Sequence, residues 1–187
     1  PTIHEILDTC RAESAHRSVE LRTHLDDVQT DLIDPDILSD VLETLVKNAI
    51  ENTPDEGEVF ISLSQAPSGL LLEVADQGVG IAESDREFLF RAFHHTQETD
   101  QYATKNPYDF DAGGKGLELL RLKILAEEGC FDISVSTQRC SHVSTSADHC
   151  PGDISLCPHV RNAEGCKQSG GTTFSVLFPS NRSVIPR

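Results

Sequence analysis

Apolar residues recur along this chain with two periods, and the longer period marks one helix clearly. Between Ile37 and Ile50 they recur in pairs four positions apart, as on one face of a helix. Asp34 and Pro35 precede this run as an N-cap and a first-turn proline, and Pro54 and Gly57 follow it. We therefore expect a long helix with one buried face.

The shorter period and the remaining apolar runs predict strands, a turn and further helices. A turn over 67–69 joins two apolar runs into a hairpin, and Gly129 ends a second long helix. The order strand, helix, two strands, loop, helix, two strands predicts an α+β two-layer sandwich, with one mixed, mainly antiparallel sheet packed on helices. The expected strands cover 19–25, 59–63, 70–74, 131–137 and 172–178; the other helices cover 117–128, a short aromatic stretch at 88–93, and a lead-in at 3–13 that could also begin as a strand.

Composition adds a strongly acidic surface to an otherwise ordinary globular chain. The 187 residues suit one domain, 1–187, with 15 basic and 31 acidic residues and a net charge of −16. That field repels polyanions, so nucleic-acid binding is not expected. No apolar run is long enough to span a bilayer and no signal peptide opens the chain, so we expect a cytoplasmic fragment without membrane contact. The start at Pro1 is typical of a boundary inside a longer protein, which leaves upstream membrane segments open.

Four short islands hold the residues from which chemistry is expected. They are 41–54 on the long helix, 76–81 after a strand, 113–117 at the start of the second long helix, and 170–174 at the start of the last strand. In this order they resemble the N box and the three glycine boxes of the ATP-binding domains of sensor histidine kinases, which are related to gyrases and chaperone ATPases. Residues 88–93 stand where the F box of that family belongs. A lone Asp-x-Gly-x-Gly is a weak signal, but four islands in family order are specific. The resemblance implies the Bergerat ATP-binding fold.

The first, second and fourth islands are expected to hold the nucleotide. Asn48 can ligate Mg²⁺ on the triphosphate through its amide oxygen, and Thr44, one turn earlier, can orient a water. Asp76 can accept a hydrogen bond from the adenine amino group, with a bridging water beside Thr172. Taken singly, Asn48 could satisfy a neighbouring loop and Asp76 could cap a turn. The resemblance adds four residues to this site, two of them glycines that let the backbone pass close under the base: Asn52, Gly78, Gly80 and Ile81.

The third island is expected to bind the phosphates of ATP. Free N–H groups and the dipole at a helix N-terminus attract phosphate oxygens, and a lysine adds charge. Taken alone, the same residues would be a flexible loop ahead of a helix. The polar stretch 97–113 before them resembles the ATP lid of the family. The phosphate-binding residues are Gly114, Lys115, Gly116 and Leu117.

These roles imply a function in which catalysis is positioning and charge neutralisation. The domain would transfer the γ-phosphate of Mg·ATP to a histidine on a separate dimerisation domain of the same protein, with a response regulator downstream. The alternative is a degenerate nucleotide-binding, or metal- or redox-sensing, regulatory module without turnover. A gyrase- or chaperone-type ATPase is less favoured, because position 44 is not a glutamate that could activate water. The departures from the family pattern that raise the alternative are Thr44, Glu51, Asn52, His95 and Glu118.

The segment 139–169 has no periodicity and is rich in Cys, Pro and Gly. It resembles a cysteine-rich insertion of one subgroup of these kinases, placed ahead of the last glycine box. Its four cysteines follow one another at intervals of nine, six and eight residues, without a Cys-x-x-Cys pair. Four thiolates would make a closed structural Zn²⁺ site, which we favour over an iron–sulfur cluster. The third alternative is that the segment is a loop of reduced thiols without a metal. The candidate ligands are Cys140, Cys150, Cys157 and Cys166, with His142, His149 and His159 as spare ligands.

Overall fold

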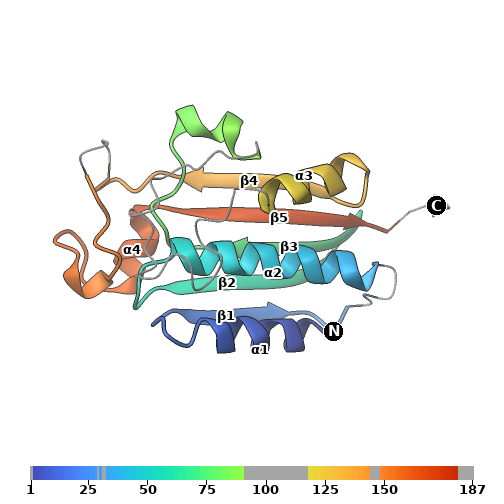
Figure 1. Ribbon diagram of the computed structural model, residues 1–187, viewed down its shortest axis with the longest axis horizontal. Helices are drawn as coiled ribbons and strands as arrows, with labels where there is room; N and C mark the ends of the chain where they lie inside the picture. The colour runs from blue at the N-terminus through green and yellow to red at the C-terminus, as the bar shows by residue number, and fades with distance from the viewer. Residues whose placement is uncertain (1, 29, 31–32, 91–117, 144–147, 181–187) are drawn as a thin grey trace.

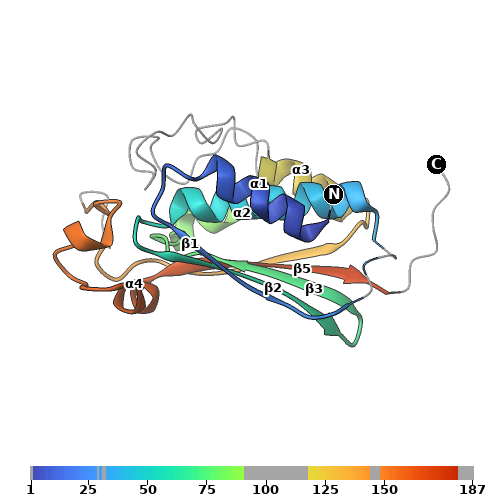
Figure 2. The same cartoon turned by 90° about the horizontal axis from the view of Figure 1, so that it is seen from below.

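Helices cover one face of the sheet in the computed structural model, which describes residues 2–28, 30, 33–90, 118–143 and 148–180 (Figure 1, Figure 2). The strands are β1 (Glu20–Leu25), β2 (Glu58–Ala66), β3 (Gly69–Ala75), β4 (Asp132–Gln138) and β5 (Gly171–Pro179), and the α-helices are α1 (Ile3–Glu13), α2 (Pro35–Asn52), α3 (Glu118–Glu127) and α4 (Ala163–Ser169). Within the described residues the strand order is β1-β2-β3-β5-β4. β1 runs parallel to β2, and the other three pairs are antiparallel. The predicted two-layer α+β sandwich with a mixed sheet is confirmed.

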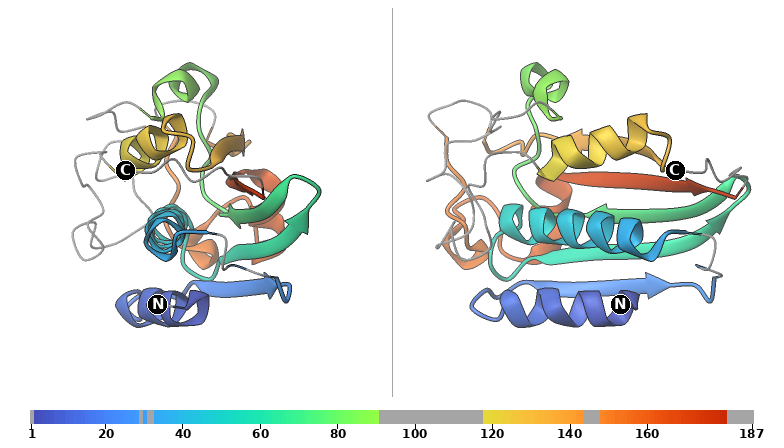
Figure 3. Two further views of the ribbon diagram at one scale, coloured as in Figure 1. Left: turned by 90° about the vertical axis from the view of Figure 1, so that its right-hand side faces the viewer. Right: turned by 45° about the vertical axis from the view of Figure 1, so that its right-hand side comes forward.

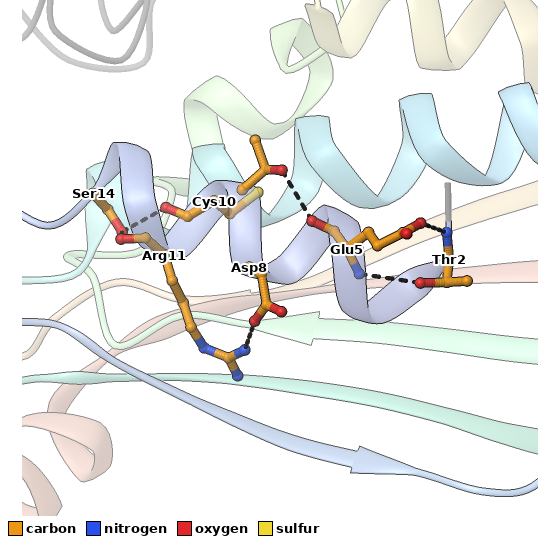
Figure 4. A network of polar contacts seen from close by, with 7 residues as sticks. Thr2, Glu5, Asp8, Cys10, Arg11 and Ser14 are labelled. Atoms are coloured by element: carbon orange, nitrogen blue, oxygen red, sulfur yellow. Dashed lines mark hydrogen bonds and ion pairs between the residues drawn. The ribbon is translucent and has the colours of Figure 1, made fainter.

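The lead-in segment forms the helix α1 because Thr2 and Glu5 cap its first turn reciprocally, each side chain accepting the backbone N–H of the other residue (Figure 4). Thr2 Oγ1 accepts the N–H of Glu5 at 3.2 Å, and Glu5 Oε2 accepts the N–H of Thr2 at 2.7 Å. The guanidinium of Arg11 donates to Asp8 Oδ1, one turn earlier, at 2.9 Å. The apolar face of α1 packs beside α2 and adds three buried side chains to the core: Ile6, Leu7 and Cys10.

The core lies between α2 and the inner face of the sheet. The side chain of Asp34 accepts the N–H of Asp36 at 2.9 Å, and Pro35 is the first helical residue, as predicted. Burying one Leu, Ile, Val or Phe side chain contributes roughly 1.5–3 kcal/mol relative to leaving it exposed. The buried residues of α2 are Leu38, Val41, Leu42, Leu45, Val46, Ala49 and Ile50; those of β2, β3 and β5 are Val59, Ile61, Leu63, Leu70, Leu72, Val74, Phe174, Val176 and Phe178.

The segment 139–169 contains regular structure that its sequence pattern did not predict. Its described residues include the 3-10 turn η3 (Ile154–Leu156) and the helix α4. Asn162 caps α4 by accepting the N–H of Gly165 at 2.8 Å. Elements this short complete too few turns to leave a periodic signal. The segment lies at the end of the sheet where β4 ends and β5 begins (Figure 1, Figure 3).

The helical turn around the predicted aromatic stretch begins earlier than expected. The 3-10 helix η1 covers Glu83–Phe88, and residues 91–93 of the predicted helix lie outside the described residues. A membrane span would need a longer and more apolar helix than any that the structure describes in this chain.

Candidate functional site

Asp76 lies where three chain segments meet, at the ends of β3 and β4 and the start of β5. The N–H of Gly78 donates to Asp76 Oδ1 at 2.8 Å, and the N–H of Thr172 donates to the same oxygen at 3.1 Å. The N–H of Asp76 donates in turn to the carbonyl of Thr172 at 2.8 Å. Both residues are buried. The fold thus brings Asp76 and Thr172 together across 96 positions of sequence, and the carboxylate also caps the turn at Gly78.

Burial controls the protonation of this carboxyl. Desolvation raises the pKa of Asp76 from its ordinary value of 3.8 to about 7, against the opposing effect of the N–H donors of Gly78 and Thr172. Between these two values the folded protein keeps a proton that the unfolded chain has already lost. Stability is therefore lost as the pH rises through this window.

We expect the free energy of unfolding to fall between about pH 5 and about pH 8 by a component of about 2–3 kcal/mol that belongs to Asp76. Urea unfolding of the wild-type protein and of Asp76→Asn at both pH values measures this component. Since the asparagine cannot ionise, the stability difference between the two proteins should change with pH. A difference that stays constant would show that Asp76 ionises near its ordinary pKa.

The end of α2 packs directly on the loop that follows Asp76. A Cβ at Gly78 would stand 2.6 Å from the backbone carbonyl oxygen of Asn52, so this position requires glycine for packing inside the protein. Asn52 Nδ2 donates to the backbone carbonyl of Asn48 at 2.8 Å and lies 3.4 Å from Asn48 Oδ1. Thr44 lies half-buried one turn earlier on α2. The structure therefore places Asn52 against Gly78, with Asn48 one turn and Thr44 two turns earlier on α2.

The same loop is fixed on its other side by the end of β4. Gly80 has a φ of 66°, and a Cβ there would stand 1.9 Å from the carbonyl oxygen of Gln138. The N–H of Ile81 donates to Thr137 Oγ1 at 2.9 Å, and this hydroxyl lies 3.1 Å from Thr172 Oγ1. The loop is thus held between α2 and β4, which positions the Asp76 carboxylate.

Three residues that support this loop were missed by the sequence analysis. Thr53 Oγ1 donates to the carbonyl of Ala49 at 2.8 Å and accepts the N–H of Gln77 at 3.4 Å. Gln77 Oε1 accepts the N–H of Glu58 at 3.1 Å. Thr137 belongs to no motif, and Thr53 and Gln77 stand within islands without a role assigned to them. The sequence signal that could have found them is a polar residue at the end of an apolar helix or strand, and this signal is weak.

Part of the predicted site lies outside the described residues. This part comprises the phosphate-binding residues Gly114, Lys115, Gly116 and Leu117, the lid 97–113, and His95. Of the other departures from the family pattern, Glu118 is exposed at the start of α3, and Glu51 is half-buried on α2.

The four cysteines of the segment 139–169 line one small pocket at the end of the sheet, with a volume of about 60 Å³. None of them is in a disulfide. In the part of the chain that the structure describes, no three His, Cys, Asp or Glu side chains are arranged to hold a metal ion. The metal centre expected from the sequence is therefore not shown. The cysteines are Cys140, Cys150, Cys157 and Cys166.

Comparison with known proteins identifies the class to which this fold and site belong. The sequence model of the histidine kinase-, DNA gyrase B- and HSP90-like ATPase family matches residues 33–182. The chain belongs to this family.

Two of the relatives that the chain matches are sensor kinases. The sensor histidine kinase CpxA of Escherichia coli (strain K12) is 33% identical over 85 residues, which are 46% of this chain and 16% of CpxA. The sensor-like histidine kinase SenX3 of Mycobacterium tuberculosis (strain CDC 1551 / Oshkosh) is 29% identical over 124 residues, 66% of this chain and 28% of SenX3. The chain thus spans less than a third of the length of these relatives.

Solved structures of histidine kinases share the fold. The mycobacterial sensor histidine kinase MprB aligns with a TM-score of 0.60 at 19% identity, covering 95% of this chain and 93% of that one. The catalytic domain of histidine kinase ThkA aligns with a TM-score of 0.57 at 19% identity, covering 95% of this chain and 90% of that one. Together with the family match, these similarities make the chain a homologue of the ATP-binding catalytic domains of sensor histidine kinases.

Proposed function

We propose that this domain binds Mg·ATP and presents its γ-phosphate to a histidine on a separate helical dimerisation domain of a longer protein. The observation that carries this proposal is the buried Asp76–Thr172 pair, whose loop packs at Gly78 on the end of α2, one turn beyond Asn48. A response regulator would then receive the phosphoryl group, in the cytoplasm. The 187 residues would act as one domain in this function.

Asp76 is proposed to select adenine. Both backbone N–H groups that reach the carboxylate bind Oδ1, so Oδ2 is the oxygen they leave to other donors. An exocyclic amine needs an acceptor, and the ionised carboxylate, which forms as the pH rises through the raised pKa of about 7, offers a strong one at Oδ2. The hydroxyl of Thr172 would hold a water beside the base. The remaining residues proposed to line the base are Asn52, Gly78, Gly80 and Ile81.

Asn48 is proposed to ligate Mg²⁺ that arrives with the triphosphate. Its amide oxygen suits a hard cation, and Asn52 Nδ2 lies close enough to orient it. Thr44 would orient a water of the same ion. Because the chain carries a net charge of −16, the phosphates need local compensation from Mg²⁺ and from backbone N–H groups. Those groups are proposed to come from Gly114, Lys115, Gly116 and Leu117, under a lid at 97–113.

Phosphotransfer tests this function in the longer protein that carries the domain. A bond forms between an imidazole nitrogen and the γ-phosphorus while the bond from that phosphorus to the bridging oxygen breaks, and ADP leaves. Label from γ-phosphate-labelled ATP should become attached to the protein in an acid-labile, alkali-stable form. Release of all the label as free phosphate would instead support an ATPase.

Asn48→Ala is expected to lower the phosphotransfer rate by roughly 100-fold, because one ligand of the ion that neutralises the transferring group is lost. It should also weaken binding of a fluorescent ATP analogue in the presence of Mg²⁺ and leave binding in a chelator unchanged. Ser39→Ala, on the same helix, is the control. Equal weakening with and without Mg²⁺ would assign Asn48 to packing instead of metal binding.

The segment 139–169 is proposed to be an insertion relative to the family, ahead of the last glycine box. The family match at residues 33–182 runs across it. Of the metals expected from the sequence, Mg²⁺ belongs to the nucleotide, and Zn²⁺ concerns this segment alone.

A further inference from the structure

The fold gathers the four cysteines of the segment 139–169 around one pocket. Cys140, Cys150, Cys157 and Cys166 all line it, although as many as nine residues separate neighbours in the sequence. The two cysteines outside the segment, Cys10 and Cys130, do not line this pocket. The clustering is therefore specific to the segment.

We infer that these four thiols form a Zn²⁺ site that holds the segment against the nucleotide loop. Four thiolates are a complete ligand set for a closed, tetrahedral structural zinc site. A pocket of about 60 Å³ is too small for a nucleotide or cofactor and large enough for an ion. Since the described side chains do not already form a group of metal ligands, binding must turn the thiols toward the pocket centre.

The part of the segment that the structure describes, residues 139–143 and 148–169, has a small core. Its regular elements are one 3-10 turn and the seven-residue helix α4. Its buried apolar side chains are Val143, Ile154 and Val160. Segments with so small a core are commonly stabilised by a metal or by disulfides.

Two of the four cysteines contact the loop that carries Asp76. The N–H of Cys140 donates to the carbonyl of Val79 at 2.7 Å, and the Cys166 thiol donates to the carbonyl of Gln77 at 3.6 Å. Arg139, next to Cys140, donates to the carbonyl of Gly80 at 3.1 Å. Three carbonyl groups of the loop, at positions 77, 79 and 80, thus accept hydrogen bonds from these two cysteines or from Arg139. Zinc binding would remove the thiol proton that Cys166 donates to Gln77, so zinc would stabilise the loop through the backbone N–H of Cys140 and the side chain of Arg139.

The segment also reaches the end of α2. The N–H of Asp55 donates to the carbonyl of Gly152 at 2.9 Å, and the N–H of Ile154 donates to the carbonyl of Asp55 at 3.1 Å. Loss of zinc is expected to loosen both supports of the proposed nucleotide pocket. This consequence rests on the proposed binding of ATP, whereas the metal site itself does not.

The test compares the full chain with Cys157→Ser and with the control Cys130→Ser. Cys157 is chosen because neither of the loop contacts above involves it. Elemental analysis of the wild-type and control proteins should find about one zinc per chain, and Cys157→Ser should lose it. Wild-type protein reconstituted with Co²⁺ should show the visible absorption of a tetrahedral thiolate site, which Cys157→Ser should lack. Affinity for a fluorescent ATP analogue should fall roughly 5- to 100-fold without zinc and return when Zn²⁺ is added.

Removal of zinc from the wild-type protein by a chelator gives the same comparison if Cys157→Ser does not fold. Absence of zinc from reduced wild-type protein, and no Co²⁺ spectrum, would overturn the site. Iron with a broad visible absorption would overturn zinc as its metal. Stoichiometric zinc with nucleotide affinity unchanged by its removal would overturn the coupling to the loop. Stoichiometric zinc in a protein that binds no nucleotide would support the metal site and reject the proposed function.

Discussion

Asp76→Asn should lower the affinity of the domain for an ATP analogue by roughly 100-fold or more. The two N–H groups from Gly78 and Thr172 bind one oxygen of the side chain, Oδ1. In the asparagine this position must stay an oxygen, because an amide nitrogen there would face two donors. The NH₂ group is therefore directed to the Oδ2 position, where, in the proposed binding mode, it would face the adenine amino group as one donor against another.

The variant should nonetheless fold, because it removes a buried carboxyl whose ionisation is unfavourable. Isothermal titration with the Mg²⁺ complex of the analogue measures the affinity, and thermal unfolding checks the fold. Asp132→Asn, at an exposed position at the start of β4, is the matched control and should bind as the wild type does. Wild-type affinity in a folded Asp76→Asn protein would show that this carboxylate does not contact the base.

Arg17→Ala should destabilise the protein by about 3–5 kcal/mol, the cost of breaking a buried ion pair on one side. Arg17 Nε donates to Asp55 Oδ1 at 2.9 Å, with side chains only 2% and 9% exposed. Its other nitrogens donate to the carbonyls of Ile50 at 3.3 Å and Thr53 at 2.7 Å, at the end of α2. The substitution leaves these acceptors without their buried donor and the carboxylate of Asp55 without this partner.

Urea unfolding of Arg17→Ala and of Arg22→Ala measures the difference. Arg22 forms ion pairs with Glu20 and Glu58, but its side chain is 50% exposed, so its loss should cost less than about 1 kcal/mol. The double variant Arg17→Met, Asp55→Asn should recover part of the stability, since it removes the uncompensated charge. If Arg17→Ala costs no more than Arg22→Ala, the buried pair contributes nothing beyond a surface pair.

Most of the secondary structure was predictable because each element has a local cause in the sequence. The period of Ile37 to Ile50, with Asp34 and Pro35 ahead of it, predicted α2 with its correct first residue. The hairpin of β2 and β3 followed from two apolar runs around one turn. α4 was missed, because a helix of seven residues leaves no period and its stability depends on the rest of the fold.

The residues of the candidate site were proposed from sequence motifs, but the residues that support them in the fold were not predicted. Asp76 and Thr172 were chosen through motifs, and the structure brings them together. The side chains that hold the loop in place, such as Thr53 and Gln77, had no such signal. Their role exists only because segments distant in sequence end at the same place.

The sequence by itself determined the order of the five strands and the longer helices, the family to which the chain belongs, and the residue types expected at the nucleotide. These depend on local periodicity and on short motifs, which a chain carries whether or not it is folded. Only the tertiary structure decided that Gly78 and Gly80 are required by packing, that Arg17 and Asp55 form a buried pair, and that four widely spaced cysteines line one pocket. Such contacts arise when the sheet pairs strands from distant parts of the chain, and no local pattern encodes that pairing.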